Sequence, residues 1–269
     1  MTTVPVGERE CDKFYRASMQ LLDRAGVSFL VGGAYAFGHY TGISRDTKDF
    51  DLFVRPEDID RALAAFVQAG YDSEKTFPHW LGKGKCQDDV IDLIYRAGNG
   101  LCEVDDTWFA RARDGELLGV PVKLCAPEEI LWMKAFIMER ERYDGADIVH
   151  IVESCAEHID WQHLVRRFGP DWRLLLSHLI LFGYVFPSER HRVPKSVLDS
   201  LVEQLRNEPV TEAGHTCRGT LLSRQQYLTD VQDRGFHDAR LEERVRMTAE
   251  DISRWTAAIT RDGSRGASR

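Results

Sequence analysis

The stretch that decides the fold reads Asp49-Phe50-Asp51-Leu52-Phe53-Val54. Its apolar residues predict a strand, and because side chains alternate across a strand, Asp49 and Asp51 lie on one face. Two carboxylates one pleat apart repel each other and lose solvation, so a cation is expected to compensate them. Mg²⁺ suits the position, because it binds a few carboxylates together with substrate phosphates. Alone, the pattern also fits a solvated strand edge or a helix cap, so the neighbouring sequence has to decide.

A pair of glycines upstream supports the metal interpretation. Gly32 and Gly33 follow the apolar run Ser28-Phe29-Leu30-Val31, and the residues from Ala34 to Tyr40 are typical of the first turns of a helix. Glycines at such a junction let backbone amides approach a phosphate closely, and the helix offers its positive N-terminal end. A glycine turn followed by the acidic strand is therefore more specific than either feature alone.

A third acid lies inside another apolar run, Val90-Ile91-Asp92-Leu93-Ile94. Burying the charge of Asp92 without a partner is costly. The partner is either the same metal or, as the alternative interpretation, a buried arginine or lysine.

A lysine stands on the apolar side of a later helix, which the sequence predicts from Pro127 to Glu141. Helical spacing places Lys134 within the apolar stripe of that helix, so it either snorkels to water or reaches into a cleft toward an anion. Three charged residues that follow belong to the same cleft or to a surface ion-pair network: Arg142, Asp144 and Asp147.

The remaining elements follow from periodicity and breakers. We expect a helix over 11–25, a helix from Pro56 to Gly70, and an irregular stretch that contains His79, Lys83 and Lys85. A hairpin around Asp114-Gly115 leads to a strand at Val120–Leu124. Beyond Tyr143 the pattern is helical throughout, with helices near 144–156, 160–168, 171–186 and 194–207.

The overall composition indicates which kinds of partner the protein is expected to bind. The net charge of −8 shows none of the basic bias with which proteins wrap nucleic acid, so a small or compact acceptor is favoured, although a local basic patch could still reach a single-stranded or hairpin end. No signal peptide or membrane span is visible, and the six scattered cysteines include no CxxC pair. These features predict a cytoplasmic protein with reduced thiols and no membrane partner.

Together the motifs resemble the DNA polymerase β-type nucleotidyltransferase superfamily, whose pattern is a hydrophobic residue before Gly-Gly or Gly-Ser, a spacer, an acidic strand and a later strand acid. The resemblance covers about residues 26–95. The region from Pro127 to Asp147 is similar to the bacterial stand-alone branch, which includes abortive-infection-type toxins and many uncharacterised proteins. One departure is Ala34, where many members carry a serine, so the turn would rely on backbone amides alone.

The resemblance implies an α/β (α+β) fold, with a small mixed sheet flanked by helices and followed by a helical C-terminal region. The implied limits are a catalytic domain over 1–143, a helical domain over 144–262 and a disordered tail over 263–269.

It also implies roles for the candidate residues. Asp49 and Asp51 would bridge two Mg²⁺ ions (or Mn²⁺), which in such sites lie about 3.5–4 Å apart, and Asp92 would ligate the catalytic metal. Lys134 would neutralise the pyrophosphate leaving group. The triphosphate, of which ATP is one candidate, would contact five residues near the turn and the acidic strand: Gly32, Gly33, Ala34, Arg45 and Lys48.

The leading hypothesis is thus transfer of a nucleoside monophosphate from a triphosphate to the hydroxyl of a small molecule, a protein or a tRNA end. Candidate acceptor contacts are Arg45, His79, Lys83 and Lys85, all of which also fit ordinary surface positions. A catalytically silent nucleotide-binding or antitoxin-like module with a partner chain is the second hypothesis. A metal-dependent phosphohydrolase is the third, and the lack of a histidine–aspartate ligand pair disfavours it.

Overall fold

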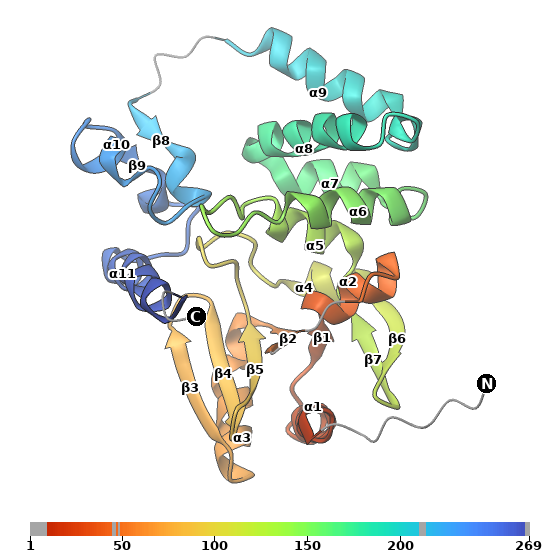
Figure 1. The fold of residues 1–269 in the computed structure, drawn as a ribbon, viewed down its shortest axis with the longest axis vertical. Coiled ribbons are helices and arrows are strands. Elements are labelled where there is room, and N and C mark those ends of the chain that lie inside the picture. The colour runs from red at the N-terminus through yellow and green to blue at the C-terminus, as the bar shows by residue number, and fades with distance from the viewer. Residues whose placement is uncertain (1–9, 45–46, 48, 210–213, 267–269) are drawn as a thin grey trace. The chain divides into compact units, whose positions relative to one another are not determined.

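The computed structural model describes residues 10–44, 47, 49–209 and 214–266, and these form two compact units (Figure 1). The first unit comprises Met1–Ala36, Ser44–Arg96 and Glu103–Cys125, as far as these are described. The second comprises Phe37–Ile43, Ala97–Cys102 and Ala126–Arg269.

The described residues of the first unit build a seven-stranded mixed sheet in the order β3-β4-β5-β2-β1-β7-β6. Its strands are β1 (Phe29–Val31), β2 (Asp49–Val54), β3 (Asp72–Phe77), β4 (Leu81–Cys86), β5 (Asp89–Ile94), β6 (Arg113–Leu117) and β7 (Val120–Leu124). The central strand β2 runs parallel to β5 and antiparallel to β1. The predicted mixed sheet with flanking helices is confirmed.

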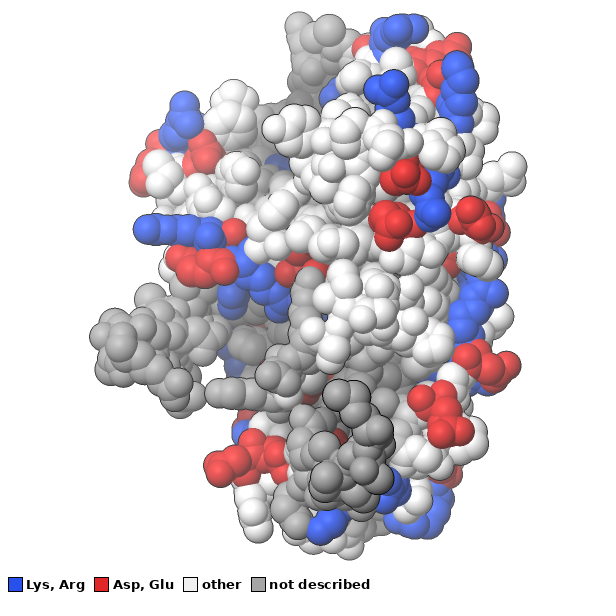
Figure 2. Space-filling model, turned by 45° about the vertical axis from the view of Figure 1, so that its right-hand side comes forward, with Lys and Arg blue, Asp and Glu red and all other residues white. Residues whose placement is uncertain are grey.

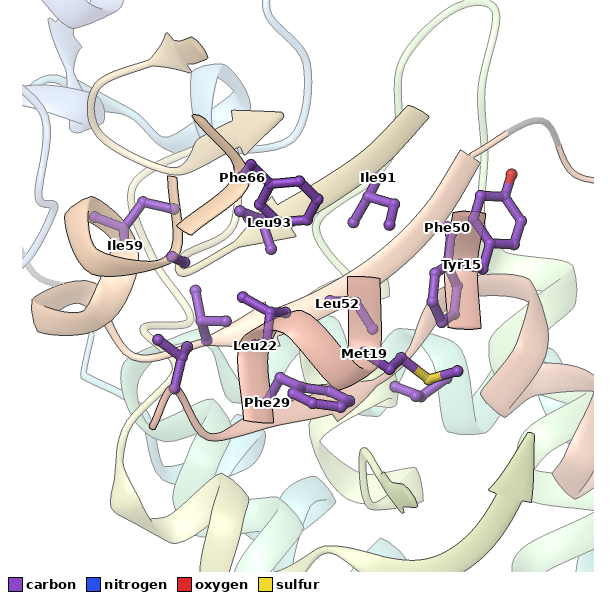
Figure 3. Packing of buried hydrophobic residues seen from close by; sticks show 14 of the residues in the cluster. Tyr15, Met19, Leu22, Phe29, Phe50, Leu52, Ile59, Phe66, Ile91 and Leu93 are labelled. Atoms are coloured by element: carbon purple, nitrogen blue, oxygen red, sulfur yellow. The ribbon is translucent and has the colours of Figure 1, made fainter. Parts of the chain in front are cut away.

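One face of this sheet carries the core of the first unit. Helix α1 (Glu10–Arg24) and helix α3 (Ile59–Gln68), which follows the 3-10 turn η1 (Pro56–Asp58), supply the opposing side chains. Figure 3 shows Phe50 and Leu52 of β2 and Ile91 and Leu93 of β5 packed among them. Because these residues alternate with Asp49, Asp51 and Asp92, the acids are directed to the opposite face.

The stretch expected to be irregular is instead an antiparallel hairpin of β3 and β4, whose register shifts between Glu74 and Phe77, so the expectation of no strand there is wrong. Its sequence lacks apolar alternation because Gly82 and Gly84 occupy the core-facing positions of β4. A Cβ atom on Gly84 would lie 2.6 Å from the ring of Phe66, and one on Gly82 would lie 3.0 Å from Ile59. Glycine therefore lets α3 approach this edge of the sheet closely.

A second correction concerns the hairpin near residue 114. Asp114 and Gly115 lie inside β6, and the turn falls at Leu118-Gly119, both of which have a positive φ. Helix α4 (Asp106–Arg111) precedes this hairpin, and the Asp105 side chain caps it by accepting hydrogen bonds from the amides of Thr107 and Trp108.

In the second unit the helix predicted over 127–141 is shorter: α5 spans Pro127–Lys134. The segment beyond it makes non-helical backbone hydrogen bonds instead. The amide of Met138 donates to the carbonyl of Leu222, and the amide of Asp144 donates to that of Ile137. These longer-range bonds compete with helix continuation and are invisible in the local sequence pattern.

The four later helices are confirmed within a residue or two of their expected ends. They are α6 (Gly145–Cys155), α7 (Trp161–Phe168), α8 (Trp172–Val185) and α9 (Lys195–Asn207). The remaining described elements are α10 (Leu228–Gln232), α11 (Ala249–Gly266), β8 (Thr216–Cys217), β9 (His237–Asp238) and four 3-10 turns, η2 (Gly169–Asp171), η3 (Arg190–Arg192), η4 (Arg218–Leu221) and η5 (Ala239–Leu241). The short parallel pair β8–β9 departs from the expectation of helix throughout.

Helix α2 (Gly33–Thr41) begins in the first unit and continues into the second. The predicted tail starts at 263, whereas α11 runs to Gly266, and the residues after it lie outside the described part of the chain. Within the described residues, no helix combines the length and apolar character needed to cross a membrane.

Candidate active site on the acidic face of the sheet

The parallel pairing of β2 with β5 brings the three predicted acids together. Asp51 lies directly opposite Asp92, and Asp49 lies opposite Val90, one pleat away. Asp49 is exposed, and Asp51 and Asp92 are half-buried. Three carboxylates that are distant in the sequence therefore share one small area of the sheet, on the face opposite the core.

The glycine turn lies against the middle acid. The amide of Gly32 donates to the carbonyl of Asp51 over 3.1 Å, and Gly33 has a φ of 53° at the start of α2. A Cβ atom on Gly33 would lie 1.8 Å from Oδ2 of Asp51. Only glycine fits there, because both the backbone conformation and the space exclude a side chain. Ala34 follows in the first turn of α2 and is half-buried.

The far end of β2 on this face is closed by aromatic rings. Phe53 stacks on the buried Trp108 of α4, with ring centroids 5.3 Å apart. A Cβ atom on Gly32 would meet the ring of Phe53 at 2.2 Å, so this residue too must be glycine. The face thus changes from exposed acid at Asp49 to packed aromatics at Phe53.

A lysine occupies the other side of Asp92. Lys83 of β4 is the direct cross-strand partner of Asp92, and its Nζ lies 2.8 Å from Oδ1 of that residue. The two side chains are 23% and 14% exposed. Burial raises the pKa of Asp92 above its ordinary value, the charge and hydrogen bond of Lys83 act against this, and the charge of Asp49 adds to it.

A second pair lies beside the first. Lys85 Nζ is 2.9 Å from Oε1 of Glu74 on β3, and this bond together with a hydrogen bond from Thr76 lowers the pKa of Glu74. Across the four strands the register aligns one row of charged residues: Glu74, Lys83, Asp92 and Asp51.

The chemistry of these side chains fits a hard divalent cation, since carboxylate oxygens are the ligands that Mg²⁺ prefers. Their arrangement fits it only in part. Among the described residues, no group of three or more histidine, cysteine, aspartate or glutamate side chains is gathered closely enough to hold a metal ion. The carboxylate of Asp92 is engaged by Lys83 instead, which is the alternative that the sequence left open.

The other predicted charges gather in the second unit. Lys134 Nζ lies 2.6 Å from Oδ2 of Asp144 and 2.8 Å from Oδ2 of Asp147, and Nε of Arg142 lies 2.9 Å from Oδ1 of Asp144. Burial alone would raise the pKa of Asp144, but the hydrogen bonds and charges of Arg142 and Lys134 lower it below its ordinary value. Both acids are buried, whereas the side chain of Arg142 is 65% exposed, so the cluster extends from the interior to the surface. The proposed contact of Lys134 with pyrophosphate stays a prediction.

Two predicted triphosphate contacts, Arg45 and Lys48, lie outside the described residues. Between them Thr47 is described: its Oγ1 donates to the carbonyl of Asp49 over 2.8 Å and accepts from the amide of Asp49 over 3.3 Å. This local turn leads the chain into β2.

The sequence did not predict the contact of Lys83 with Asp92, because Lys83 fitted an ordinary surface position. The contact depends on recognising β4, and the available signal was that Leu81, Lys83 and Lys85 occupy every second position. The intervening glycines hid it, because glycine is uncommon in strand interiors.

No family model matches this chain, and no curated protein matches it either. Solved structures that are similar include the antibiotic-resistance factor ANT(2'')-Ia (16% identity, 62% of this chain and 95% of that chain, TM-score 0.44). A nucleotidyltransferase-like protein from Paracoccidioides brasiliensis matches at 18% identity over 71% and 92% of the two chains, with a TM-score of 0.45. The lincosamide adenylyltransferase LnuA matches at 14% identity over 53% and 96%, with a TM-score of 0.38.

Two of these three proteins are named as a nucleotidyltransferase-like protein and an adenylyltransferase. At such identities and TM-scores, the function of this chain has to be argued from its own residues. Its surface charge is one such feature: on the face shown in Figure 2, lysine and arginine side chains lie among aspartates and glutamates rather than in one continuous basic area.

Proposed function

We propose that the protein is a Mg²⁺-dependent nucleotidyltransferase, which moves a nucleoside monophosphate from a triphosphate to an acceptor hydroxyl. The observation that carries the proposal is the register of β2 with β5, which sets Asp51 beside Asp92. The contact of Gly33 with Asp51 supports it, because this contact brings the start of a helix to the acids.

Within this proposal Asp49, Asp51 and Asp92 would hold two Mg²⁺ ions, which would supply positive charge to the attacking and leaving oxygens. The Gly32-Gly33 turn would hold the triphosphate through the amides of Gly33 and Ala34, because the amide of Gly32 donates to the carbonyl of Asp51. The acceptor oxygen forms a bond to the α-phosphorus while the bond to pyrophosphate breaks, and Asp92, as a ligand of the catalytic metal, would favour loss of the hydroxyl proton to solvent.

Lys134, which the resemblance assigns to the leaving group, would balance the negative charge on pyrophosphate. To do so its ammonium would exchange contacts with Asp144 and Asp147 for contacts with the phosphate.

The acceptor is a small molecule such as an antibiotic, a protein side chain or a tRNA 3′ end. A net charge of −8 favours a compact acceptor over a long nucleic acid backbone.

The test is transfer of label from α-labelled triphosphates to fractionated cell extract in Mg²⁺. The wild-type protein should label an acceptor, and the double variant Asp49→Asn with Asp51→Asn should remain folded and transfer at least about a hundredfold less label. Equal transfer by the double variant would contradict the assignment of the site. Absence of both transfer and triphosphate binding would contradict the proposed function.

One observation favours a second candidate, a nucleotide-binding module without turnover. Asp92 is paired with Lys83 rather than gathered with the other two acids. Triphosphate binding that survives without any transfer, in every extract fraction and with every base, would favour this second candidate.

A further inference from the structure

Asp92 stands between two neighbours of opposite charge. On β5 it faces Asp51 across one strand pairing and Lys83 across the other. A cation shared with Asp51 has to draw the carboxylate toward β2, whereas the ammonium of Lys83 holds it toward β4. The ammonium engages Oδ1 of Asp92, so it and a cation shared with Asp51 would lie on opposite sides of one carboxylate and repel each other.

The neighbouring pairs leave Lys83 committed to Asp92. Glu74 is opposite Lys83 on β3, but its Oε1 accepts from Lys85 and from Thr76. Asp92 also gains from the pairing, because burial disfavours its charge and the ammonium compensates this cost.

The pair also sets the charge of the site. Asp49, Asp51 and Asp92 carry three negative charges, and the ammonium of Lys83 cancels one of them. The attraction of this face for a divalent cation is therefore weaker than three carboxylates alone would provide.

We propose that Lys83 is a built-in competitor of the divalent cation: its ammonium holds Oδ1 of Asp92 in the metal-free protein, and its positive charge opposes a cation bound by the three acids. This inference rests on the proposed function, because it takes the three acids as the metal ligands. Lys83 thereby limits metal occupancy, and it is a positioning residue for Asp92 rather than a catalytic one.

The four-carbon stem of Lys83 lets its ammonium move away from a cation that binds on this face. Its side chain is 23% exposed, so the ammonium can turn to water or to a bound phosphate without leaving the face of the sheet.

The experiment measures the dissociation constant for Mn²⁺, by titration followed by electron paramagnetic resonance, without nucleotide. Lys83→Met removes the competing charge and should tighten Mn²⁺ binding about tenfold or more, because an adjacent unit charge acts strongly at a partly buried site. Lys83→Arg keeps the charge and should bind Mn²⁺ about as the wild type does.

The matched control is Lys85→Met, which removes a lysine from the same face of the same strand. Lys85 pairs with Glu74, so its loss should change the Mn²⁺ affinity at most about twofold. In an Asp92→Asn background the effect of Lys83→Met on Mn²⁺ affinity should vanish, because the contested carboxylate is gone.

Thermal unfolding supplies a second measurement on the same variants. Lys83→Met should lower the melting temperature in chelator, since Asp92 then lacks its counter-ion. Saturating Mn²⁺ should raise the melting temperature of this variant by more than it raises that of the wild type. A purely structural lysine would lower stability and leave Mn²⁺ affinity unchanged, and that result overturns the inference.

The failure of this inference differs from the failure of the proposed function. If the wild type and Lys83→Met bind Mn²⁺ equally, and Asp49→Asn with Asp51→Asn abolishes binding, Lys83 is no competitor but the metal site stands. If none of these proteins binds Mn²⁺, both the inference and the proposed metal site are wrong.

Discussion

Gly33 and Asp51 form the tightest backbone-to-carboxylate approach in the candidate site. Gly33 combines a positive φ with a position where a Cβ atom would lie 1.8 Å from Oδ2 of Asp51. The acid and the start of α2 are therefore linked in two ways: the amide of Gly32 bonds the backbone carbonyl of Asp51, and the carboxylate of Asp51 excludes a side chain at Gly33.

We predict that Gly33→Ala lowers transfer activity about a hundredfold, because displacing a metal ligand by an ångström has effects of this size. Stability should fall by about 1–2 kcal/mol from the left-handed conformation alone. Rates of label transfer and urea unfolding measure the two effects.

Gly26→Ala is the matched control. Gly26 has a φ of 65°, but nothing lies within 4 Å of an added Cβ atom. It should lose similar stability and keep its activity, and an equal loss of activity in both variants would contradict a role for the Gly33–Asp51 contact.

Some of these residues could be predicted from sequence and others could not. Asp49, Asp51 and Asp92 stand out because charges inside apolar runs need partners. The sequence could not decide whether a metal or a lysine is the partner of Asp92, since this depends on which strand lies next to β5. Lys134 stood out in the same way, yet its partners Asp144 and Asp147 required the end of α5 to be known.

At the scale of elements, the β3–β4 hairpin shows how packing overrides propensity. Two glycines in β4 weaken its intrinsic preference for a strand, and in return α3 packs closely against them. The same strand presents Lys83 to Asp92, so the geometry of the hairpin reaches the candidate site.

We predict that Gly84→Ala destabilises the protein by about 1–3 kcal/mol, because its Cβ atom would lie 2.6 Å from the ring of Phe66 in a packed core. Chemical denaturation measures this change. Gly183→Ala in α8 serves as the control, since its Cβ atom would lie 3.7 Å from Arg190 and alanine favours a helix by up to about 1 kcal/mol. Unchanged stability in Gly84→Ala would mean that α3 does not need this close approach.

Helix α8 contains a buried histidine, His178, whose Nε2 lies 3.4 Å from the carbonyl of Ala135. Burial lowers the pKa of His178 below its ordinary value of 6.5, and the carbonyl opposes this shift. The folded state therefore favours neutral His178, and the stability this gives is present above pH 6.5 and is lost as the pH falls through the lowered pKa.

We predict that His178→Phe, which keeps a ring but cannot take up a proton, loses less stability than the wild type between about pH 7.5 and about pH 5. The measurement is the free energy of unfolding across this range. His158→Phe, at an exposed histidine, should follow the wild-type profile. Parallel profiles for all three proteins would show that His178 does not contribute to the acid sensitivity.

At the scale of the whole molecule, the described chain divides into a sheet unit with the three acids and a mainly helical unit with the Lys134 cluster. Most helices and the strands β1, β2, β5 and β7 could be predicted, because their apolar patterns are local. The seven-strand order and the pairing of Asp51 with Asp92 could not, because they join segments that are far apart in the sequence. The residues of the candidate site could thus be found from short sequence motifs, whereas their arrangement required the structure.

If the acidic face of β2 and β5 holds a metal-bound triphosphate, binding of a non-hydrolysable nucleoside triphosphate must depend on both the metal and the acids. Calorimetric titration of the wild type in Mg²⁺ and in chelator, beside Asp49→Asn with Asp51→Asn in Mg²⁺, measures this directly. The predicted result is binding by the wild type in Mg²⁺ that weakens at least about tenfold in chelator and in the double variant. Equal affinity under all three conditions would contradict the account.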